Sequence, residues 1–429
     1  MMSAYNTIFY GIPYISCILV GIGVLSFVLQ KPAILARSIG FSFQFWLAPL
    51  FYFSYVAIGQ RTSAVVVIAA CLELLFLAVY QVLFRRLFVA VTANSPQHLS
   101  RMLIYVKVGT WILVALLVPI FLQSGVGIFS NGSRLDFLVG SRWNVYLVYA
   151  SMLVQVVLPP VAAVIVNVEK RWPSPVVVYL VVISAISVLS GSKGGVILTL
   201  LAIISLLKFD RRRDYFRVLL VPICAAASLF SITLYFVGQF LSLNPFEMAS
   251  LMFSRIFLNN DCRALAIDWS GYLGDSGSSL FGEAFRLYAT LLGNAPRYPP
   301  LGQLLYSLQF GTVGLIGANT SSTALLVAYG SDLEKLFFTI LLVGAALVIG
   351  LLADIRGRAD VPRLALCISL LGLLSQDFFA FQIDMNILIL IFVAILTTGM
   401  LAKILRLASA KRAMTHGTAM TLPHRREIG

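Results

Sequence analysis

The residues best suited to chemistry lie in a moderately polar stretch, residues 241–330, between blocks of membrane-like hydrophobicity. Four arginines fall in it: Arg255, Arg263, Arg286 and Arg297. A guanidinium keeps its positive charge at any working pH, and its planar fork can bind an oxyanion through two hydrogen bonds. The same stretch supplies carboxylates that can accept a proton, and the candidates among them are Asp261, Asp268 and Glu283. The stretch is therefore the candidate functional site.

Two amphipathic helices are expected to position these side chains. Over residues 245–269 the apolar residues recur at helical spacing, and Arg255, Asn259 and Arg263 share one polar stripe at i, i+4 and i+8. Residues 271–279 are typical of turns, and residues 280–292 form a second segment with Glu283 and Arg286 three apart. Helices of this kind usually lie flat at the bilayer surface, where they could cover a lateral, lipid-accessible cavity.

The composition indicates an all-α, polytopic integral membrane protein. Apolar residues make up 60% of the chain and charged residues 11%, whereas soluble domains average roughly 25% charged residues. A span needs about twenty apolar residues to cross roughly 30 Å of hydrocarbon. About eleven spans are predicted, at 7–29, 38–58, 63–83, 103–123, 145–167, 175–190, 194–207, 218–240, 333–354, 362–382 and 385–402. The segments predicted are 1–240, an N-terminal transmembrane block; 241–332, a large outer loop with amphipathic helices; and 333–429, C-terminal transmembrane helices and a basic tail.

The basic residues predict the orientation of the chain. Most of the 31 lysines and arginines fall in alternate loops and in the C-terminal tail, and short cytoplasmic loops retain such residues. The pattern predicts an N-terminus outside, a C-terminus in the cytoplasm and the long loop outside. The N-terminus lacks a basic region before its apolar run, so we expect a first span and no cleaved signal peptide. The net charge of +14 is then a signal of topology and not of nucleic-acid binding.

Two charged residues lie inside predicted spans. Glu73 is flanked by apolar residues on both sides, and Lys107 lies near the cytoplasmic end of its span. Because a charge at the centre of a span costs about 2.5–3.5 kcal/mol on insertion scales, Glu73 must face protein or water. It could mark a proton or substrate path, or form a buried structural pair, with Lys107 as one candidate partner.

Several motifs together resemble the O-antigen and exopolysaccharide repeat-unit polymerases of the Wzy type. They are the Ser-Gly-Ser-Lys-Gly-Gly break at 190–195, the large arginine-bearing loop, and the run Gly-Ala-Asn-Thr-Ser-Ser-Thr at 317–323 that leads into Ala328–Leu333 before the next span. The likeness covers roughly residues 100–400. It implies a glycosyltransferase of the bacterial inner membrane, with a periplasmic loop, that joins undecaprenyl-diphosphate-linked oligosaccharide repeat units into a polysaccharide. It also implies a flippase and a chain-length regulator as partners, beside membrane lipid.

The resemblance implies roles for the loop residues. The leaving group is a diphosphate, which a cation must meet, and the candidates are Arg263, Arg255, Arg286, Arg297 and Lys193. Lys193 stands where such proteins often have arginine, among glycines whose backbone N–H groups suit an anion. The base that takes the proton of the acceptor hydroxyl is expected to be Asp261, Asp268 or Glu283. Neither a metal nor a cofactor is expected, and the analogy implies inversion at the anomeric carbon.

Other functions stay open at this point, and so do non-catalytic roles for the same residues. A flippase or another transporter of lipid-linked oligosaccharide would also be polytopic and basic inside, although no internal repeat of the kind common in transporters is visible. An O-antigen ligase or a membrane acyltransferase would use a histidine, and His98, His416 and His424 all fall on the predicted cytoplasmic side. Loop arginines can also pair with lipid phosphates, and Glu283 with Arg286 can be an ordinary surface pair.

Overall fold

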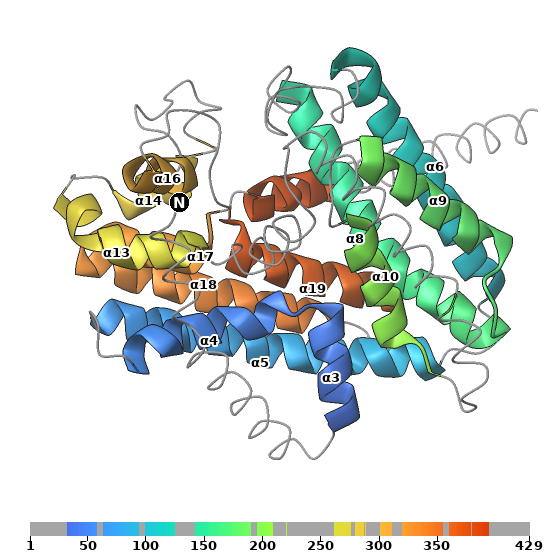
Figure 1. Ribbon diagram of the computed structural model, residues 1–429, viewed down its shortest axis with the longest axis horizontal. Helices are drawn as coiled ribbons and strands as arrows, with labels where there is room; N and C mark the ends of the chain where they lie inside the picture. Colours follow the sequence, from blue (N-terminus) through green and yellow to red (C-terminus); the bar gives the residue numbers. More distant parts are fainter. Residues whose placement is uncertain are drawn as a thin grey trace, which may run out of the picture. The chain divides into compact units, whose positions relative to one another are not determined.

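The structure is a computed structural model, and the residues that it describes are helical, with no strand among them (Figure 1). It describes residues 32–57, 63–93, 99–124, 142–189, 195–208, 220, 261–275, 279–286, 288, 301–310, 320–354, 360–378 and 380–393. The predicted all-α class is therefore confirmed for this part of the chain. The predicted spans 7–29 and 218–240 lie outside the described residues, apart from Leu220.

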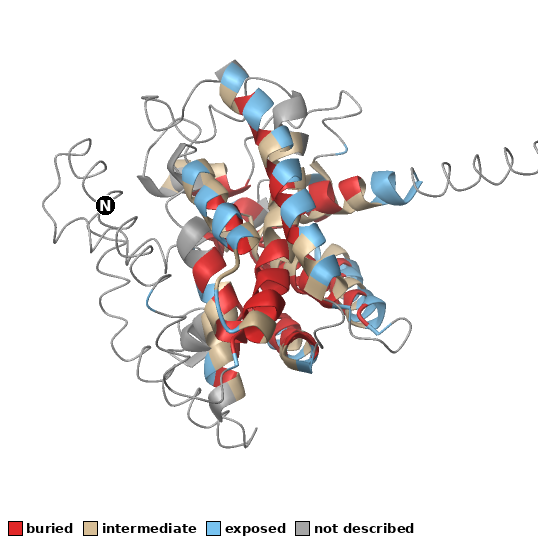
Figure 2. Ribbon diagram, turned by 90° about the vertical axis from the view of Figure 1, so that its right-hand side faces the viewer, coloured by how far each residue is buried: buried red, intermediate tan, exposed pale blue. Residues whose placement is uncertain are grey.

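Four of the described helices are long and apolar enough to cross a membrane. They are α5 (Ala64–Ala93), α6 (Leu99–Ser124), α8 (Arg142–Glu169) and α18 (Asp332–Leu352). Apolar side chains such as Trp111 and Leu122 on α6 and Leu351 on α18 are exposed, as Figure 2 shows for the outward faces of the helices. In a soluble protein, such large apolar faces would be exposed to water, which is unfavourable. These faces are therefore suited to contact with lipid.

The remaining predicted spans correspond to shorter helices. Predicted spans 175–190, 194–207 and 362–382 fall on α9 (Ser174–Leu189), α10 (Gly195–Leu206) and α19 (Val361–Gln376). The apolar helix Ala380–Val393 covers part of the predicted span 385–402, whose residues 394–402 lie outside the described residues. The predicted span 38–58 is divided into α3 (Pro32–Phe41) and α4 (Gln44–Ala57). A Cβ on Gly40, at the end of α3, would lie 2.8 Å from the hydroxyl oxygen of Ser205. Hence α3 packs closely on α10 there, before the chain begins a new helix.

The chain divides into two compact units, Met1–Phe381 and Gln382–Gly429. Helices from all three predicted segments lie in the first unit, including those of the predicted loop: α13 (Asp261–Asp275), α14 (Leu280–Ala284), α16 (Leu301–Phe310) and α17 (Ser322–Ala328). Helix α13 packs on α17, and α17 packs on α5. Of these helices, α17 therefore packs directly on α5, which is long and apolar enough to cross a membrane, and α13 packs on α17.

Polar side chains from two other helices satisfy the C-terminal carbonyls of α10. Asn167 on α8 donates its amide to the carbonyl of Leu206 at 3.0 Å and accepts the backbone N–H of Lys208 at 2.7 Å. Arg37 on α3 donates to the carbonyl of Leu207, and Lys170 donates to that of Lys208. The last carbonyls of a helix have no partner within it and carry partial negative charge, which suits these donors.

Asn167→Leu should lower the stability of the folded protein measurably. The buried side chain makes two hydrogen bonds to backbone groups, and each group left without a partner costs about 1–3 kcal/mol. Thermal unfolding of the purified protein in detergent measures the loss. Thr110→Val is the control, since its buried hydroxyl donates to the carbonyl of Val106 in its own helix. Equal losses in the two variants would argue against the capping role.

Candidate functional site

The structure separates the predicted site residues into three groups. Arg255, Arg297 and Lys193 lie outside the described residues. Asp261 is the first residue of α13, and its side chain is not described, whereas Asp268 is exposed. The other three residues fall into two clusters, one around Arg263 and one formed by Glu283 with Arg286.

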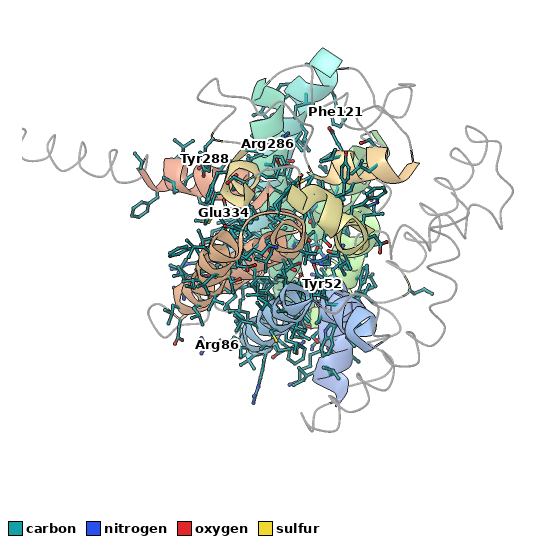
Figure 3. All side chains as sticks on the ribbon, turned by 90° about the vertical axis from the view of Figure 1, so that its left-hand side faces the viewer. Tyr52, Arg86, Phe121, Arg286, Tyr288 and Glu334 are labelled. Carbon is teal, nitrogen blue, oxygen red and sulfur yellow. The ribbon has the colours of Figure 1, made fainter. Side chains whose placement is uncertain are left out.

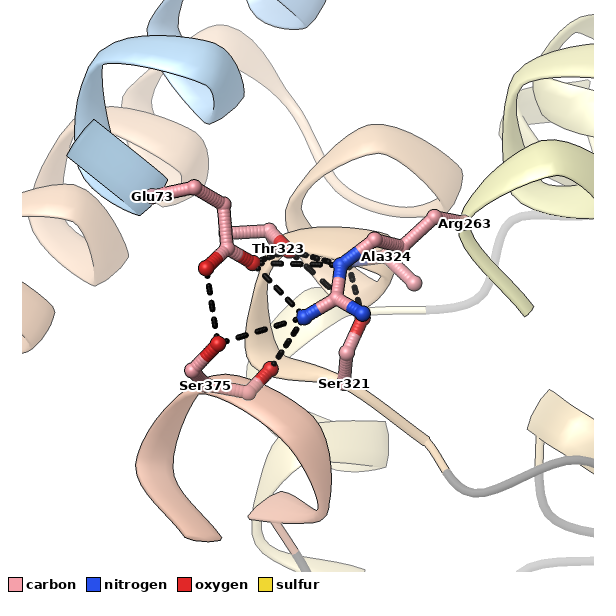
Figure 4. A network of polar contacts seen from close by, with 6 residues as sticks. All are labelled: Glu73, Arg263, Ser321, Thr323, Ala324 and Ser375. Atoms are coloured by element: carbon pink, nitrogen blue, oxygen red, sulfur yellow. Dashed lines mark hydrogen bonds and ion pairs between the residues drawn. The ribbon is translucent and has the colours of Figure 1, made fainter. Parts of the chain in front are cut away.

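Arg263 forms a buried ion pair with Glu73 of α5. Its Nη2 and Nε donate to Oε1 of Glu73 at 2.8 and 3.1 Å, and both side chains are 1% exposed (Figure 4). Nη2 also donates to the carbonyl and the hydroxyl of Ser375, at 2.9 and 3.2 Å. The guanidinium therefore lies inside the helix packing, where it is part of a buried ion pair, although the sequence predicts only that Arg263 lies on a polar stripe.

Hydroxyl groups complete the coordination of the Glu73 carboxylate. Thr323 donates to Oε1 and Ser375 donates to Oε2, both at 2.7 Å. Thr323 lies in the first turn of α17, whose N-cap is Ser321, and Ser375 lies near the end of α19. The pair thus joins four helices, α5, α13, α17 and α19. A buried ion pair is tolerated only when further hydrogen bonds of this kind satisfy both charges.

These contacts decide between the two interpretations of Glu73. The carboxylate belongs to a buried pair, but its partner is Arg263, and Lys107 is exposed. Figure 3 shows Tyr52 of α4, whose hydroxyl is also buried near this pair. With both charges satisfied inside the protein, Arg263 does not face a space where a diphosphate could bind in this conformation.

The second cluster is partly accessible and lies at the C-terminal end of α14, with Glu283 in the helix and Arg286 just beyond it. Nε of Arg286 donates to Oε2 of Glu283 at 3.1 Å, and the two side chains are 12% and 11% exposed. The predicted i, i+3 pair is confirmed. Oε1 of Glu283 accepts the backbone N–H of Leu301 at 2.9 Å, at the first residue of α16. The carboxylate is therefore held from two sides, by a guanidinium and by the positive end of a helix.

The environment shifts the acid–base properties of this cluster. Burial raises the pKa of Glu283 above the 4.5 usual for glutamate, although the charge of Arg286 and the hydrogen bonds from Arg286 and Leu301 act in the opposite direction. Burial also raises the pKa of Tyr329, and the negative charge of Glu283 raises it further. Tyr329 ends α17, so α17 lies between the two clusters, with Thr323 near one end and Tyr329 at the other.

A corner between α17 and α18 supports the second cluster. Ser331 caps α18, and its side chain and backbone form a capping box with Glu334. Oε1 of Glu334 accepts the hydroxyl of Ser279 at 2.6 Å, and Ser279 is the N-cap of α14. Figure 3 labels Arg286 and Glu334 where α14 packs on α18. The element that carries Glu283 is thus tied to the start of α18, one of the helices long and apolar enough to cross a membrane.

Gly330→Ala should disturb this corner. Gly330 has a φ of +87°, which favours glycine, and a Cβ there would lie 2.7 Å from the Cβ of Leu280 on α14. We expect a lower unfolding temperature, at a cost of about 1–3 kcal/mol for the backbone conformation alone. Gly344→Ala in α18 is the control, because a Cβ there meets no atom within 4 Å. Similar unfolding temperatures for Gly330→Ala and wild type would show that the close approach does not constrain α14.

Several contacts of the site could not be predicted from the polar stripes of the expected amphipathic helices. The hydroxyls of Thr323 and Ser375 carry no distinctive sequence signal, whereas the Ser-x-x-Glu pattern of Ser331 and Glu334 is a recognisable capping box. Among the described residues no group of three or more histidine, cysteine, aspartate and glutamate side chains could hold a metal ion.

The described residues define a class of protein: they are helical, several of their helices are apolar and suited to a membrane, and a buried ion pair joins α13 to one of these helices, α5. Comparison with known proteins takes the assignment no further. No protein-family model matches the sequence, and neither a curated protein nor a solved structure does so.

Proposed function

We propose that the protein is a glycan polymerase that joins undecaprenyl-diphosphate-linked repeat units on the periplasmic face of the bacterial inner membrane. The resemblance in the arrangement of spans, central break and loop supports this function. The structural observation that supports it is the Glu283–Arg286 pair: a carboxylate and a guanidinium 3.1 Å apart, largely desolvated but still accessible. Low local polarity strengthens the interaction of such groups with a charged substrate.

The reaction requires two functions that this pair could supply. The acceptor hydroxyl oxygen attacks the anomeric carbon of the donor chain, and the bond from that carbon to the diphosphate oxygen breaks. The electron pair leaves with the diphosphate, whose growing negative charge Arg286 would stabilise. Glu283 would take the proton of the acceptor hydroxyl as general base. Asp261 and Asp268 remain alternative bases, and Arg255, Arg297 and Lys193 remain further candidates for diphosphate binding.

Arg263 takes a different part in this proposal. Its guanidinium is already bonded to Glu73 and Ser375 and is 1% exposed, so it would support the site and not contact the diphosphate. We therefore rank Arg286 first for diphosphate binding. Among the candidate bases, Glu283 comes first because it lies directly against that arginine.

Vesicles that contain the purified protein and the lipid-linked repeat unit of the host's own pathway distinguish a polymerase from a flippase. A polymerase should convert the repeat unit into a ladder of longer glycans, resolved on a gel. Faster movement of the same lipid between the two leaflets, with no ladder, would assign the protein to lipid transport and overturn the proposal.

The rate of chain extension should fall toward acid pH, with its midpoint above pH 4.5. The pKa of Glu283 is raised by burial, so a larger fraction of this base is protonated, and inactive, at a given acid pH. Arg286 lowers that pKa, and Arg286→Gln should therefore move the midpoint to higher pH in its residual activity. A profile of kcat/KM against pH measures both. An unchanged midpoint in Arg286→Gln would contradict the assignment of Glu283 as the base.

A further inference from the structure

Charged groups mark two levels along the membrane-spanning helices. Near the C-terminal ends of α5 and α18, Arg86 and Asp354 form an exposed ion pair with an N–O distance of 2.9 Å. At the other end of α18, Ser331 and Glu334 form an exposed capping box. Glu334 precedes Asp354 by twenty residues, which corresponds to roughly 30 Å along a helix. That length matches the hydrocarbon thickness of a bilayer, about 30 Å, so the two levels fit its two boundaries.

Glu73 lies between these levels. It precedes Arg86 by thirteen residues of the same helix, or roughly 20 Å along α5. It therefore lies about 10 Å inside the boundary marked by Glu334, taking the helices as close to parallel to the membrane normal. An unpaired carboxylate at this depth would be costly. Its ion pair with Arg263 therefore requires the first turn of α13 to lie at the same depth.

Helix α17 fits the same placement, taking its axis as close to parallel to that of α5. Its Thr323 donates to Glu73, so the first turn of α17 lies at the level of the carboxylate. From Thr323 to Tyr329 the chain advances six residues, or roughly 9 Å of helix, and α18 begins two residues after Gly330. This rise matches the depth of about 10 Å obtained from α5. All seven residues of α17 are buried, as expected for a helix enclosed by its neighbours.

We propose that Glu73 is a positioning residue, which holds the first turns of α13 and α17 within the membrane and thereby places the Glu283–Arg286 pair at its outer boundary. The connection runs from Glu73 through Thr323 and α17 to the corner at Gly330, against which α14 packs. Helices α13 and α17 are then partly inserted and do not belong to a wholly external loop. The effect on the reaction rests on the proposed function, whereas the insertion of α13 does not.

Cys262 offers a natural reporter of this insertion. It precedes Arg263, its side chain is 1% exposed, and its sulfur is not part of a disulfide. In a protein whose other four cysteines, at 17, 71, 224 and 367, are replaced by alanine, a membrane-impermeant maleimide reports on Cys262 alone. We expect this thiol to be nearly unreactive in vesicles that contain the otherwise unaltered protein.

Glu73→Gln should make Cys262 react at least about tenfold faster with the maleimide added from the outer side, because the first turn of α13 loses its charged anchor. Arg86→Gln, which breaks an exposed pair on the same helix, should leave the rate unchanged. Should Glu73→Gln not fold, Thr323→Val removes one hydrogen bond to Glu73 and should give a smaller increase. Protection of Cys262 in each folded variant, or labelling only from the cytoplasmic side, would overturn the insertion.

The positioning role has a second readout. If Glu73 acts through the Glu283–Arg286 pair, folded Glu73→Gln should lower kcat for chain extension at least about tenfold more than Arg86→Gln does, and Glu73→Asp, which keeps the charge, should recover part of it. Equal kcat values in Glu73→Gln and wild type would overturn this role. The labelling experiment needs no substrate, so a protein that labels as expected but makes no glycan would contradict the proposed function and leave the insertion intact.

Discussion

Arg286→Ala is expected to lower the rate of chain extension by about 10²–10³-fold, the usual effect of losing one group that stabilises charge in a transition state. The guanidinium would meet the departing diphosphate, and it also holds Glu283, its partner at 3.1 Å. Arg286→Lys keeps a charge but not the planar fork, so we expect an intermediate rate. Initial rates with the lipid-linked repeat unit, at equal amounts of folded protein, measure all three proteins.

Arg171→Ala is a matched control for the loss of a charge. Arg171 pairs with Glu169 at 3.0 Å and is 76% exposed, and surface pairs of this kind contribute little to stability. The rate of chain extension by Arg171→Ala should equal that of the wild type. If Arg286→Ala is also as active as wild type while fully folded, Arg286 does not bind the diphosphate and another cation must do so.

Glu73→Ala should be the most destabilising single substitution among those considered. It leaves the guanidinium of Arg263 buried without its carboxylate, and breaking a buried pair from one side costs about 3–5 kcal/mol. Arg263→Ala should have a similar effect for the converse reason. Thermal unfolding in lipid nanodiscs measures both, with Arg86→Ala as the control for an exposed pair.

The double variant Glu73→Leu with Arg263→Met tests the cause of that loss. Replacing a buried ion pair by apolar side chains of similar size is often close to neutral, so the double variant should be more stable than either single variant. This recovery is the mark of a coupled pair. If the loss of stability in the double variant equals the sum of the losses in the two single variants, the two charges are not coupled.

The helical class and the longest spans could be predicted from composition and hydropathy, because apolar runs such as α5, α6, α8 and α18 carry a strong signal. The ends of the helices could not be predicted in this way. The sequence predicts turns from residue 271, but α13 continues to Asp275, since one helix can tolerate glycines that its packing stabilises. The predicted span 38–58 is divided into two helices close to the point where Gly40 approaches Ser205, a contact between distant residues that neither segment alone predicts.

The contacts of the candidate site could be predicted from the sequence only where they join residues close together in the chain. Glu283 and Arg286 are three residues apart, so helical spacing predicts their contact, which the structure has. Arg263 and Glu73 are 190 residues apart, and no pattern within either segment predicts that they pair. A charge within a span indicates that a partner exists, but the choice between Lys107 and Arg263 depends on tertiary packing.

The most direct test of the proposed polymerase counts the undecaprenyl diphosphate released while glycan chains lengthen in vesicles that contain only this protein and its lipid-linked repeat unit. If the protein is this polymerase, one carrier is released for each glycosidic bond formed, and both quantities fall together in Arg286→Ala. No release and no lengthening, from folded protein supplied with its own host's repeat unit, would contradict the proposed function.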